Sequence, residues 1–183
     1  MHLVLKKPTI PPFPDFLDEV FFGMGCFWGV EKLFWDIKGV WSTAVGYAGG
    51  SKSNPTYEDV CSGESGHAEV VRVVFDSKIV TIDSLLKTFW KSHDPTQGMR
   101  QGNDIGSQYR SIIMLTKKQH FDIAETSQLR VNDILRKNNF NETTTQIQFF
   151  EEFYYAEDYH QQYLEKNPNG YCNRQGHQLS LEY

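Results

Sequence analysis

The sequence predicts a single domain of the α+β class. Its 183 residues fit one domain of ordinary size, and the 39% of hydrophobic residues are enough to fill a core. Strand-like runs and helix-like periodicities follow one another without the strict alternation that favours a doubly wound parallel sheet. These observations together favour α+β.

The first predicted elements are a strand, a turn and a helix. The strand is the short apolar run Val20–Phe22. Residues 26–37 then carry apolar side chains at helical spacing, which are Phe27, Val30, Phe34 and Ile37. The glycine and cysteine at positions 25 and 26 therefore lie at the turn between strand and helix.

Periodicity and turn residues divide the rest of the chain. Further strands are expected at residues 40–50, 68–76, 111–115 and 143–150. Further helices are expected at residues 82–90, 116–138 and 156–167. Thr81 is a suitable N-cap for the first of these helices. Two long polar loops remain, residues 51–67 with one short helix near Tyr57, and residues 93–110. Loops of that length are usually functional.

Composition also suggests three sections. Residues 1–19 contain several prolines and are expected to form an extended arm. Residues 20–170 hold every periodic segment and are expected to form the catalytic domain. Residues 171–183 show no periodicity, so we expect a flexible C-terminal tail.

Charge and hydropathy argue against two classes of partner. The formal net charge is −5, whereas a nucleic-acid surface normally needs a basic patch. No segment approaches the roughly 18 consecutive apolar residues of a membrane span, and the N-terminus has no apolar stretch long enough for a signal peptide. We therefore expect a cytoplasmic protein, a monomer, that binds neither nucleic acid nor membrane.

Three cysteines limit the sulfur chemistry. Cys26, Cys61 and Cys172 are too few and too scattered for a disulfide framework, and without a CxxC pair no metal site is expected. A disulfide in this chain would be transient and catalytic rather than structural.

Cys26 is the first candidate for catalysis. At the start of a helix, free N–H groups and the helix dipole favour an anion, which can lower a thiol pKa below about 8.5. The alternative is that Cys26 is only a small buried hydrophobe. Phe27 and Trp28 follow directly and point in different directions, so at least one of them is free to line a pocket beside the thiol.

The other candidates are polar side chains in or beside the loops. Glu69 begins a strand and could face inward, where burial would keep it protonated, or it could be an edge-strand carboxylate in water. Tyr57 and Tyr109 could donate from their loops or could form a surface lid. Asp104 could hold its own turn, and His160 by default is a surface or capping histidine.

Seven segments closely resemble the A-type peptide methionine sulfoxide reductase family. The resemblance runs from about Phe21 to Cys172, and the combination of GCFWG, GHAE and GNDIGSQYRS is highly specific. The segments are GCFWGVE (25–31), GYAGG (46–50), NPTYEDVCSG (54–63), GHAEVVRVVFD (66–76), HDPTQGMRQGNDIGSQYRS (93–111), FYYAEDYHQQYL (153–164) and KNPNGYC (166–172).

The resemblance implies a fold and a set of roles. The fold is a two-layer α/β sandwich around a mixed sheet. Cys26 is implied as the nucleophile, and Glu69 as the acid that protonates the sulfoxide oxygen. The other implied roles are S-methyl binding by Phe27 and Trp28, proton donation by Tyr57 and Tyr109, substrate-backbone binding by Asp104 and His160, and disulfide formation by Cys172.

The implied reaction repairs oxidative damage in proteins. The family reduces the S epimer of methionine sulfoxide without a metal or organic cofactor, through a cysteine sulfenic acid and a disulfide that a dithiol such as thioredoxin reopens. The tail has no second recycling cysteine, so a single Cys26–Cys172 disulfide is expected. Cys61 has no role in this scheme and is expected to be packing or an inert bystander.

Two other functions compete with this interpretation. A cysteine hydrolase or acyl transferase would use His67 or His160 to activate Cys26, and would not need Cys172. A non-catalytic module that recognises methionine through its aromatic residues would lose no thiol when substrate is added.

Overall fold

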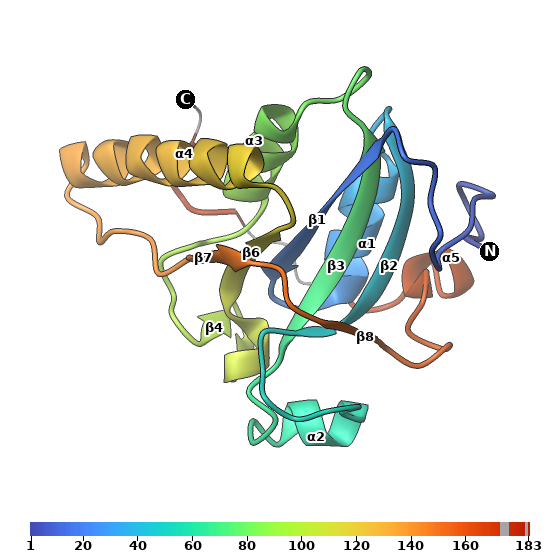
Figure 1. The fold of residues 1–183 in the computed structure, drawn as a ribbon. Helices are drawn as coiled ribbons and strands as arrows, with labels where there is room; N and C mark the ends of the chain where they lie inside the picture. The colour runs from blue at the N-terminus through green and yellow to red at the C-terminus, as the bar shows by residue number, and fades with distance from the viewer. Residues whose placement is uncertain (173–175, 182) are drawn as a thin grey trace.

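A six-stranded mixed sheet forms the centre of the computed structural model, which describes residues 1–172, 176–181 and 183 (Figure 1). The strand order is β7-β6-β1-β3-β2-β8. Neighbouring strands are antiparallel, except β6 and β7, which are parallel. Helices flank this sheet, so the expected α+β class and mixed sheet are confirmed.

The strands in chain order are β1 Leu17–Met24, β2 Val40–Ala48, β3 Ala68–Asp76, β6 Ser111–Leu115, β7 Gln146–Phe149 and β8 Phe153–Tyr155. β4 (Arg100–Gln101) and β5 (Asp104–Ile105) form a separate small hairpin. β3 pairs with both β1 and β2 and is therefore a central strand. This central position places residue 69 inside the protein.

The helices are α1 Phe27–Trp35, α2 Tyr57–Cys61, α3 Ile82–Ser92, α4 Lys118–Lys137 and α5 Tyr163–Lys166, with a 3-10 turn at Ser107–Tyr109. The predicted strand–turn–helix unit is confirmed in β1 and α1, and so is the short helix at Tyr57. Thr81 caps α3 as predicted, because its hydroxyl accepts a hydrogen bond from the Ser84 N–H.

Alternation along β1 builds two cores. Val20, Phe22 and Met24 point toward α1, α3 and α4 and join the main hydrophobic cluster. Phe21 points to the opposite face, where it stacks on Phe150 with ring centroids 4.2 Å apart. The helices thus cover one face of the sheet, and connecting segments cover the other.

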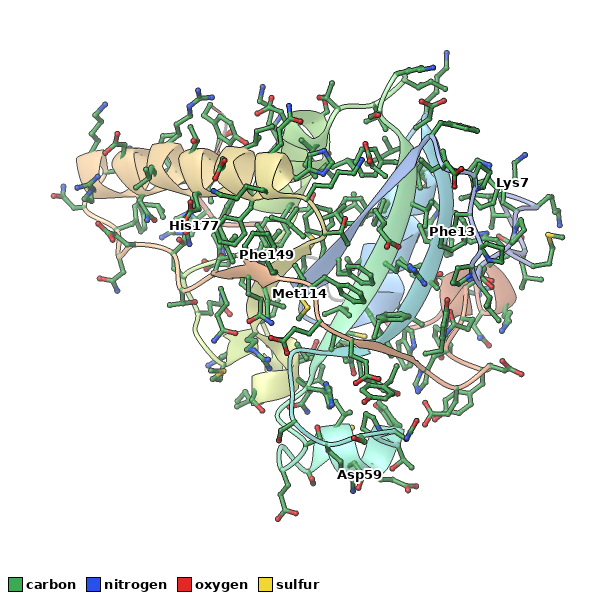
Figure 2. The ribbon with its side chains drawn as sticks, viewed as in Figure 1. Lys7, Phe13, Asp59, Met114, Phe149 and His177 are labelled. Carbon is green, nitrogen blue, oxygen red and sulfur yellow. The ribbon has the colours of Figure 1, made fainter. Side chains whose placement is uncertain are left out.

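The N-terminal segment packs more closely than an extended arm would. β1 begins at Leu17, so residues 17–19 belong to the sheet and not to the predicted arm of residues 1–19. Phe13 lies 4.8 Å from the Arg72 guanidinium, on the second face of the sheet (Figure 2). His2 is fully buried.

Two predicted elements are shorter in the structure. The strand expected at residues 143–150 is only Gln146–Phe149, because the Thr143 N–H donates to the Asn132 side chain of α4 and the Thr144 N–H donates to the Pro95 carbonyl instead. The helix expected at residues 156–167 is helical only from Tyr163, because Gln161 bonds to the backbone of β2 and Gln162 has a left-handed conformation.

The predicted flexible tail of residues 171–183 lies partly outside the described residues, at positions 173–175 and 182. Of the described part, Leu181 is buried, and Leu179 and Tyr183 pack against the main cluster. None of the described helices is long and apolar enough to cross a membrane. Location in the cytoplasm stays a prediction.

Candidate active site

Cys26 stands at the junction between β1 and α1, as its N-cap residue. Gly25 turns the chain there with φ +89°, and a Cβ at this position would lie 2.7 Å from the Gln101 side chain. A glycine is therefore required on both conformational and steric grounds. The Cys26 side chain is partly exposed, so a small molecule can reach the thiol.

Glu69 lies next to this turn and is almost completely buried, with 2% of its surface exposed. One carboxylate oxygen accepts a hydrogen bond of 3.0 Å from the N–H of Phe27, the residue after the thiol. Burial raises the pKa of Glu69 to about 8, against the opposing effect of that hydrogen bond. The carboxyl group is therefore protonated near neutral pH and can act as an acid. The alternative of an edge-strand carboxylate in water is wrong, because β3 is central.

The expectation that the helix N-terminus lowers the thiol pKa is also wrong. Burial raises the pKa of Cys26, and the nearby Glu69 raises it further, while a hydrogen bond from the Trp28 N–H acts in the other direction. α1 has only nine residues, and its end group does not offset the desolvation of the thiol. The resting thiol is therefore protonated.

The two aromatic residues after the thiol have different environments. Phe27 is buried in the main core, with its ring 5.1 Å from the ring of His160. Trp28 is partly exposed and stacks on Tyr163 with 3.9 Å between ring centroids. The prediction that at least one aromatic side chain is free to line a pocket is met by Trp28. No role for Tyr163 was predicted from the sequence, although this residue lies in the FYYAEDYHQQYL segment.

His160 is buried, and its prediction as a surface or capping histidine is wrong. Only 1% of it is exposed, because the segment before α5 folds back onto α1. Its Nδ1 accepts a hydrogen bond of 3.0 Å from the Trp28 indole. Burial lowers the pKa of His160, so the ring is neutral and carries its proton on Nε2. That nitrogen is buried without a hydrogen-bond partner among the described residues.

Tyr57 and Tyr109 lie in the two different polar loops, residues 51–67 and 93–110. Tyr57 begins α2, and Tyr109 ends the 3-10 turn. Burial raises the pKa of each phenol, and each interacts electrostatically with Glu69. Both hydroxyl groups are therefore protonated donors near the buried acid.

Asp104 is connected to the segment that carries the third cysteine, Cys172. The Tyr171 hydroxyl donates a hydrogen bond of 3.0 Å to Asp104 Oδ1. Cys172 follows Tyr171, is exposed, and interacts electrostatically with the Cys26 thiol. The structure therefore brings every predicted site residue to one region.

Cys61 is the remaining cysteine. It ends α2 and is exposed, so of the two expected alternatives the packing residue is wrong and the inert bystander stays a prediction. Its thiol and the Tyr57 hydroxyl share a hydrogen bond. The described part of the chain holds no cluster of three or more His, Cys, Asp or Glu side chains arranged for a metal ion. That the reaction needs no cofactor stays a prediction.

The site thus combines a partly exposed thiol, a buried neutral acid and an aromatic wall, the name used here for Trp28 with its contacts His160 and Tyr163. This combination is typical of a cysteine-dependent enzyme. The family model described as "Peptide methionine sulfoxide reductase" matches residues 18–181. A relative from Brucella anthropi, "Peptide methionine sulfoxide reductase MsrA", is 56% identical over 96% of this chain and 80% of its own length.

Solved structures agree with this match. Methionine sulfoxide reductase A of Corynebacterium diphtheriae has a TM-score of 0.88 at 43% identity, covering 93% of this chain and 83% of that one. Reduced Mxr1 from Saccharomyces cerevisiae has a TM-score of 0.80 at 32% identity, covering 92% and 96%. Mxr1 in complex with Trx2 matches in fold, with a TM-score of 0.58 at 23% identity over 93% and 97%.

The chain belongs to the peptide methionine sulfoxide reductase family. It is an enzyme of that class, so the hydrolase and the non-catalytic module are set aside.

Proposed function

We propose that this enzyme reduces the S epimer of methionine sulfoxide, free or in proteins, to methionine, and that Cys26 and Glu69 carry out the chemical step. The observation that carries this proposal is the hydrogen bond between Glu69 and the Phe27 N–H. It holds a neutral acid beside the residue that bears the thiol. Sulfoxide reduction needs this pair, because the S–O bond breaks only when the oxygen is protonated.

The first step forms a sulfenic acid. Cys26 sulfur attacks the sulfoxide sulfur as Glu69 gives its proton to the oxygen. The attack forms an S–S bond between Cys26 and the substrate, with the hydroxyl group still on the substrate sulfur. The hydroxyl group then moves to the Cys26 sulfur as the S–S bond and the substrate S–O bond break, which releases methionine and leaves Cys26 as a sulfenic acid. Glu69 takes up the thiol proton and ends as it began, so the thiol is oxidised by two electrons and the sulfoxide reduced by two. Tyr57 and Tyr109 donate to the oxygen.

Aromatic and polar side chains bind different parts of the substrate. Trp28 and Phe27 bind the S-methyl group, where apolar and sulfur–aromatic contacts are favourable. Asp104 and His160 hold the backbone of the substrate residue; the buried Nε2 proton of His160 is a suitable donor. With the methyl group fixed, only one epimer directs its oxygen toward Glu69.

The second half of the cycle restores the thiol. The Cys172 thiol condenses with the Cys26 sulfenic acid to a disulfide and water, and a thioredoxin dithiol reopens the disulfide by exchange. The electrostatic interaction between Cys172 and Cys26 supports this pairing. The complex of Mxr1 with Trx2 supports the choice of reductant. We further propose that the enzyme works as a cytoplasmic monomer, without a cofactor, in repair of oxidative damage.

The test is a single turnover without reductant. Reduced enzyme receives the separated S and R epimers of a methionine sulfoxide peptide, and released methionine and remaining thiols are counted. We expect about one methionine per chain from the S epimer only, with loss of the thiols of Cys26 and Cys172. Cys172→Ser should keep the methionine but lose only one thiol, whereas the control Cys61→Ser should behave like the original chain. No methionine from either epimer would overturn the proposal.

A further inference from the structure

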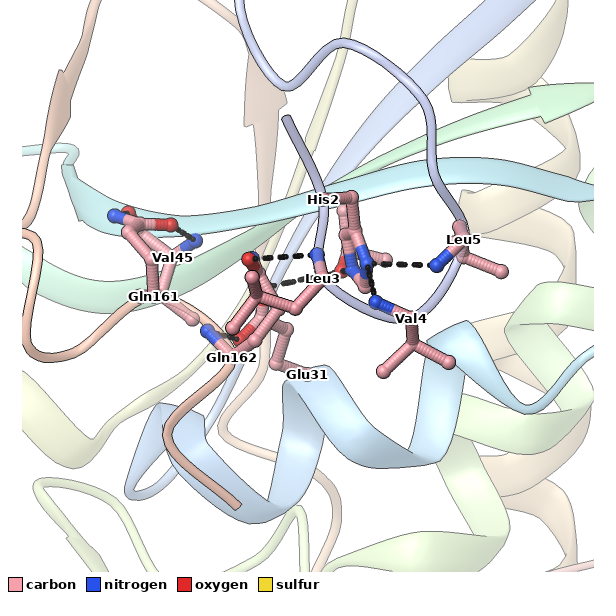
Figure 3. Close-up of polar contacts among 9 residues, drawn as sticks. His2, Leu3, Val4, Leu5, Glu31, Val45, Gln161 and Gln162 are labelled. Carbon is pink, nitrogen blue, oxygen red and sulfur yellow. Dashed lines mark hydrogen bonds and ion pairs between the residues drawn. The ribbon is translucent and has the colours of Figure 1, made fainter. Parts of the chain in front are cut away.

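A second buried carboxyl group, Glu31, lies on α1 three residues after Trp28. It is fully buried. Its Oε2 accepts a hydrogen bond of 2.7 Å from the Gln162 N–H, and its Oε1 accepts one of 2.8 Å from the Gln162 side chain. The Thr43 hydroxyl donates a third, of 3.0 Å, to Oε1. Figure 3 shows Gln162 lying beside Glu31.

His2 fixes the direction of this network. Its Nδ1 accepts hydrogen bonds from the N–H groups of Val4 and Leu5, both of 3.1 Å. A neutral ring then carries its proton on Nε2, which donates to Thr43 Oγ1 at 2.8 Å. Thr43 must therefore donate its own proton to Glu31. Three donors converge on one carboxyl group, an arrangement that favours the ionised form.

The backbone that Glu31 holds is strained. Gln162 has φ 49° and ψ 44°, a left-handed conformation that residues with a side chain rarely adopt. Such a conformation persists only where its surroundings determine it. Both the backbone and the side chain of Gln162 are bound by the same carboxyl group, so Glu31 is the group that determines it.

This turn lies between two residues that contact the Trp28 indole. His160 lies two residues before Gln162 and binds the Trp28 indole. Tyr163 lies one residue after it and stacks on the same indole. Trp28 and Glu31 are three residues apart on α1 and thus share a helix face. The helix therefore contacts the segment of residues 160–163 at two points, one aromatic and one polar.

We propose that Glu31 is a positioning residue for substrate binding. It holds Gln162 so that His160 and Tyr163 stand in the correct places against Trp28. The inference deepens the proposed function, because it assumes that this aromatic wall binds the substrate.

The energetics favour such a role over a purely stabilising one. Burial raises the pKa of Glu31 to about 7, although hydrogen bonds from Gln162 and Thr43 oppose that shift. A buried carboxylate is weak evidence for stability, since an apolar side chain of similar volume is often as stable. Its three directed hydrogen bonds instead specify one conformation of the turn.

The experiment compares Glu31→Gln with the original enzyme. The amide has the same shape but only one acceptor oxygen, so at least one of the three donors loses its partner. Single-turnover reduction at increasing peptide sulfoxide concentrations gives the half-saturation concentration and the limiting rate. In parallel, 5-fluorotryptophan labelling gives a ¹⁹F resonance for Trp28, assigned with Trp28→Phe. Val131→Ala in the core of α4 serves as a control that lowers stability far from the turn.

We expect Glu31→Gln to raise the half-saturation concentration about tenfold, to change the limiting rate less than about threefold, and to shift the Trp28 resonance. Gln162→Ala, which keeps the backbone hydrogen bond, should cause smaller changes in the same direction, and it tests the proposal if Glu31→Gln does not fold. Val131→Ala should leave both readouts unchanged.

An unchanged half-saturation concentration and an unchanged Trp28 resonance in folded Glu31→Gln would overturn the inference. An enzyme that reduces no sulfoxide at all would overturn the proposed function instead. In that event the ¹⁹F resonance of Trp28 in Glu31→Gln still tests whether Glu31 positions the residues around Trp28.

Discussion

Two buried carboxyl groups, Glu69 beside the thiol and Glu31 behind the aromatic wall, have opposite surroundings. Both are almost fully buried, and burial raises the pKa of both, to about 8 and about 7. Glu69 accepts one hydrogen bond, from a backbone N–H. Glu31 accepts three.

The difference shows that the number of donors aimed at a buried acid decides what it can do. With one donor, Glu69 keeps its proton and the capacity to give it to a ligand. With three donors from the chain itself and no exposed surface, Glu31 serves the conformation of the chain. Burial alone would have assigned both groups to catalysis.

The largest effect is expected from a change at Glu69, the carboxyl group that we assign to the chemical step. Glu69→Gln removes the acid but keeps the shape, so the rate of sulfoxide reduction should fall by about 10²–10³-fold. Methionine release in a single turnover measures it. The exposed carboxylate Glu64 in the adjacent loop gives the control, and Glu64→Gln should not change the rate. A fall of less than about fivefold in Glu69→Gln would contradict the assignment.

Removing the phenolic donors should have a smaller effect on the same step. Tyr57→Phe and Tyr109→Phe are each expected to lower the single-turnover rate about tenfold, because each hydroxyl is one of two that can bind the oxygen. Tyr155→Phe, whose hydroxyl binds Arg72 on another part of the sheet, is the control. Equal rates in all three variants would show that the phenols do not assist Glu69.

The pKa of Glu69 also predicts how stability depends on pH. Its folded pKa of about 8 lies above the ordinary value of 4.5, so the folded chain holds this proton more tightly than the unfolded chain. The free energy of unfolding should therefore fall as the pH rises from 4.5 through 8, by on the order of a few kcal/mol from this group. Glu69→Gln should lose that part of the fall.

Urea unfolding of both proteins at pH 5 and pH 8.5 measures this difference. The histidines with lowered pKa, His2 and His93, change stability in the acid range, but they are the same in both proteins and cancel in the comparison. Identical pH profiles would show that Glu69 does not titrate in this way.

A smaller effect is expected from a change in the hydrogen-bond network around Glu31. His2→Ala removes the donor that directs the Thr43 hydroxyl toward Glu31. We expect a two- to threefold higher half-saturation concentration, and a melting temperature lower by about 2–4 °C for each kcal/mol lost. Ile10→Ala, at an exposed position, is the control. A higher melting temperature in His2→Ala would contradict the network.

The smallest effect is expected at Cys61. Cys61→Ser keeps a hydroxyl that can pair with Tyr57, so activity with thioredoxin should change less than about twofold. A loss of more than about fivefold would show that Cys61 takes part in the cycle.

The sequence predicted the class of fold, and it singled out candidate site residues that the structure brings to one region, because both depend on local patterns and motifs. The β1–α1 turn follows from an apolar strand, glycines and helical spacing within some 15 residues. Of the seven segments that carry the resemblance, GCFWGVE lies at this turn, and NPTYEDVCSG and HDPTQGMRQGNDIGSQYRS lie in or at the end of the two long loops. For these features the neighbouring residues supply the decisive information.

What the sequence missed depends on residues that are distant along the chain. The burial of Glu69 follows from β3 pairing with two strands, and strand order is not written in residues 68–76. The raised pKa of Cys26 depends on burial of the thiol and on the nearby Glu69. The burial of His160 depends on Gln161 and Gln162, whose side chains bind β2 and α1 in place of a continued helix.

The hydrogen bond from the Phe27 N–H to Glu69 has a mechanical consequence. Phe27 is covalently joined to Cys26, so the nucleophile and the acid move as one rigid part, mounted where α1 meets the central strand. Away from Tyr57, Gln101, Asp104 and Tyr109, the polar loops at residues 51–67 and 93–110 can then gain, lose or exchange residues without altering the spacing of that pair. Changes in loop length should therefore alter which oxidised proteins gain access, while the bond-breaking geometry stays constant.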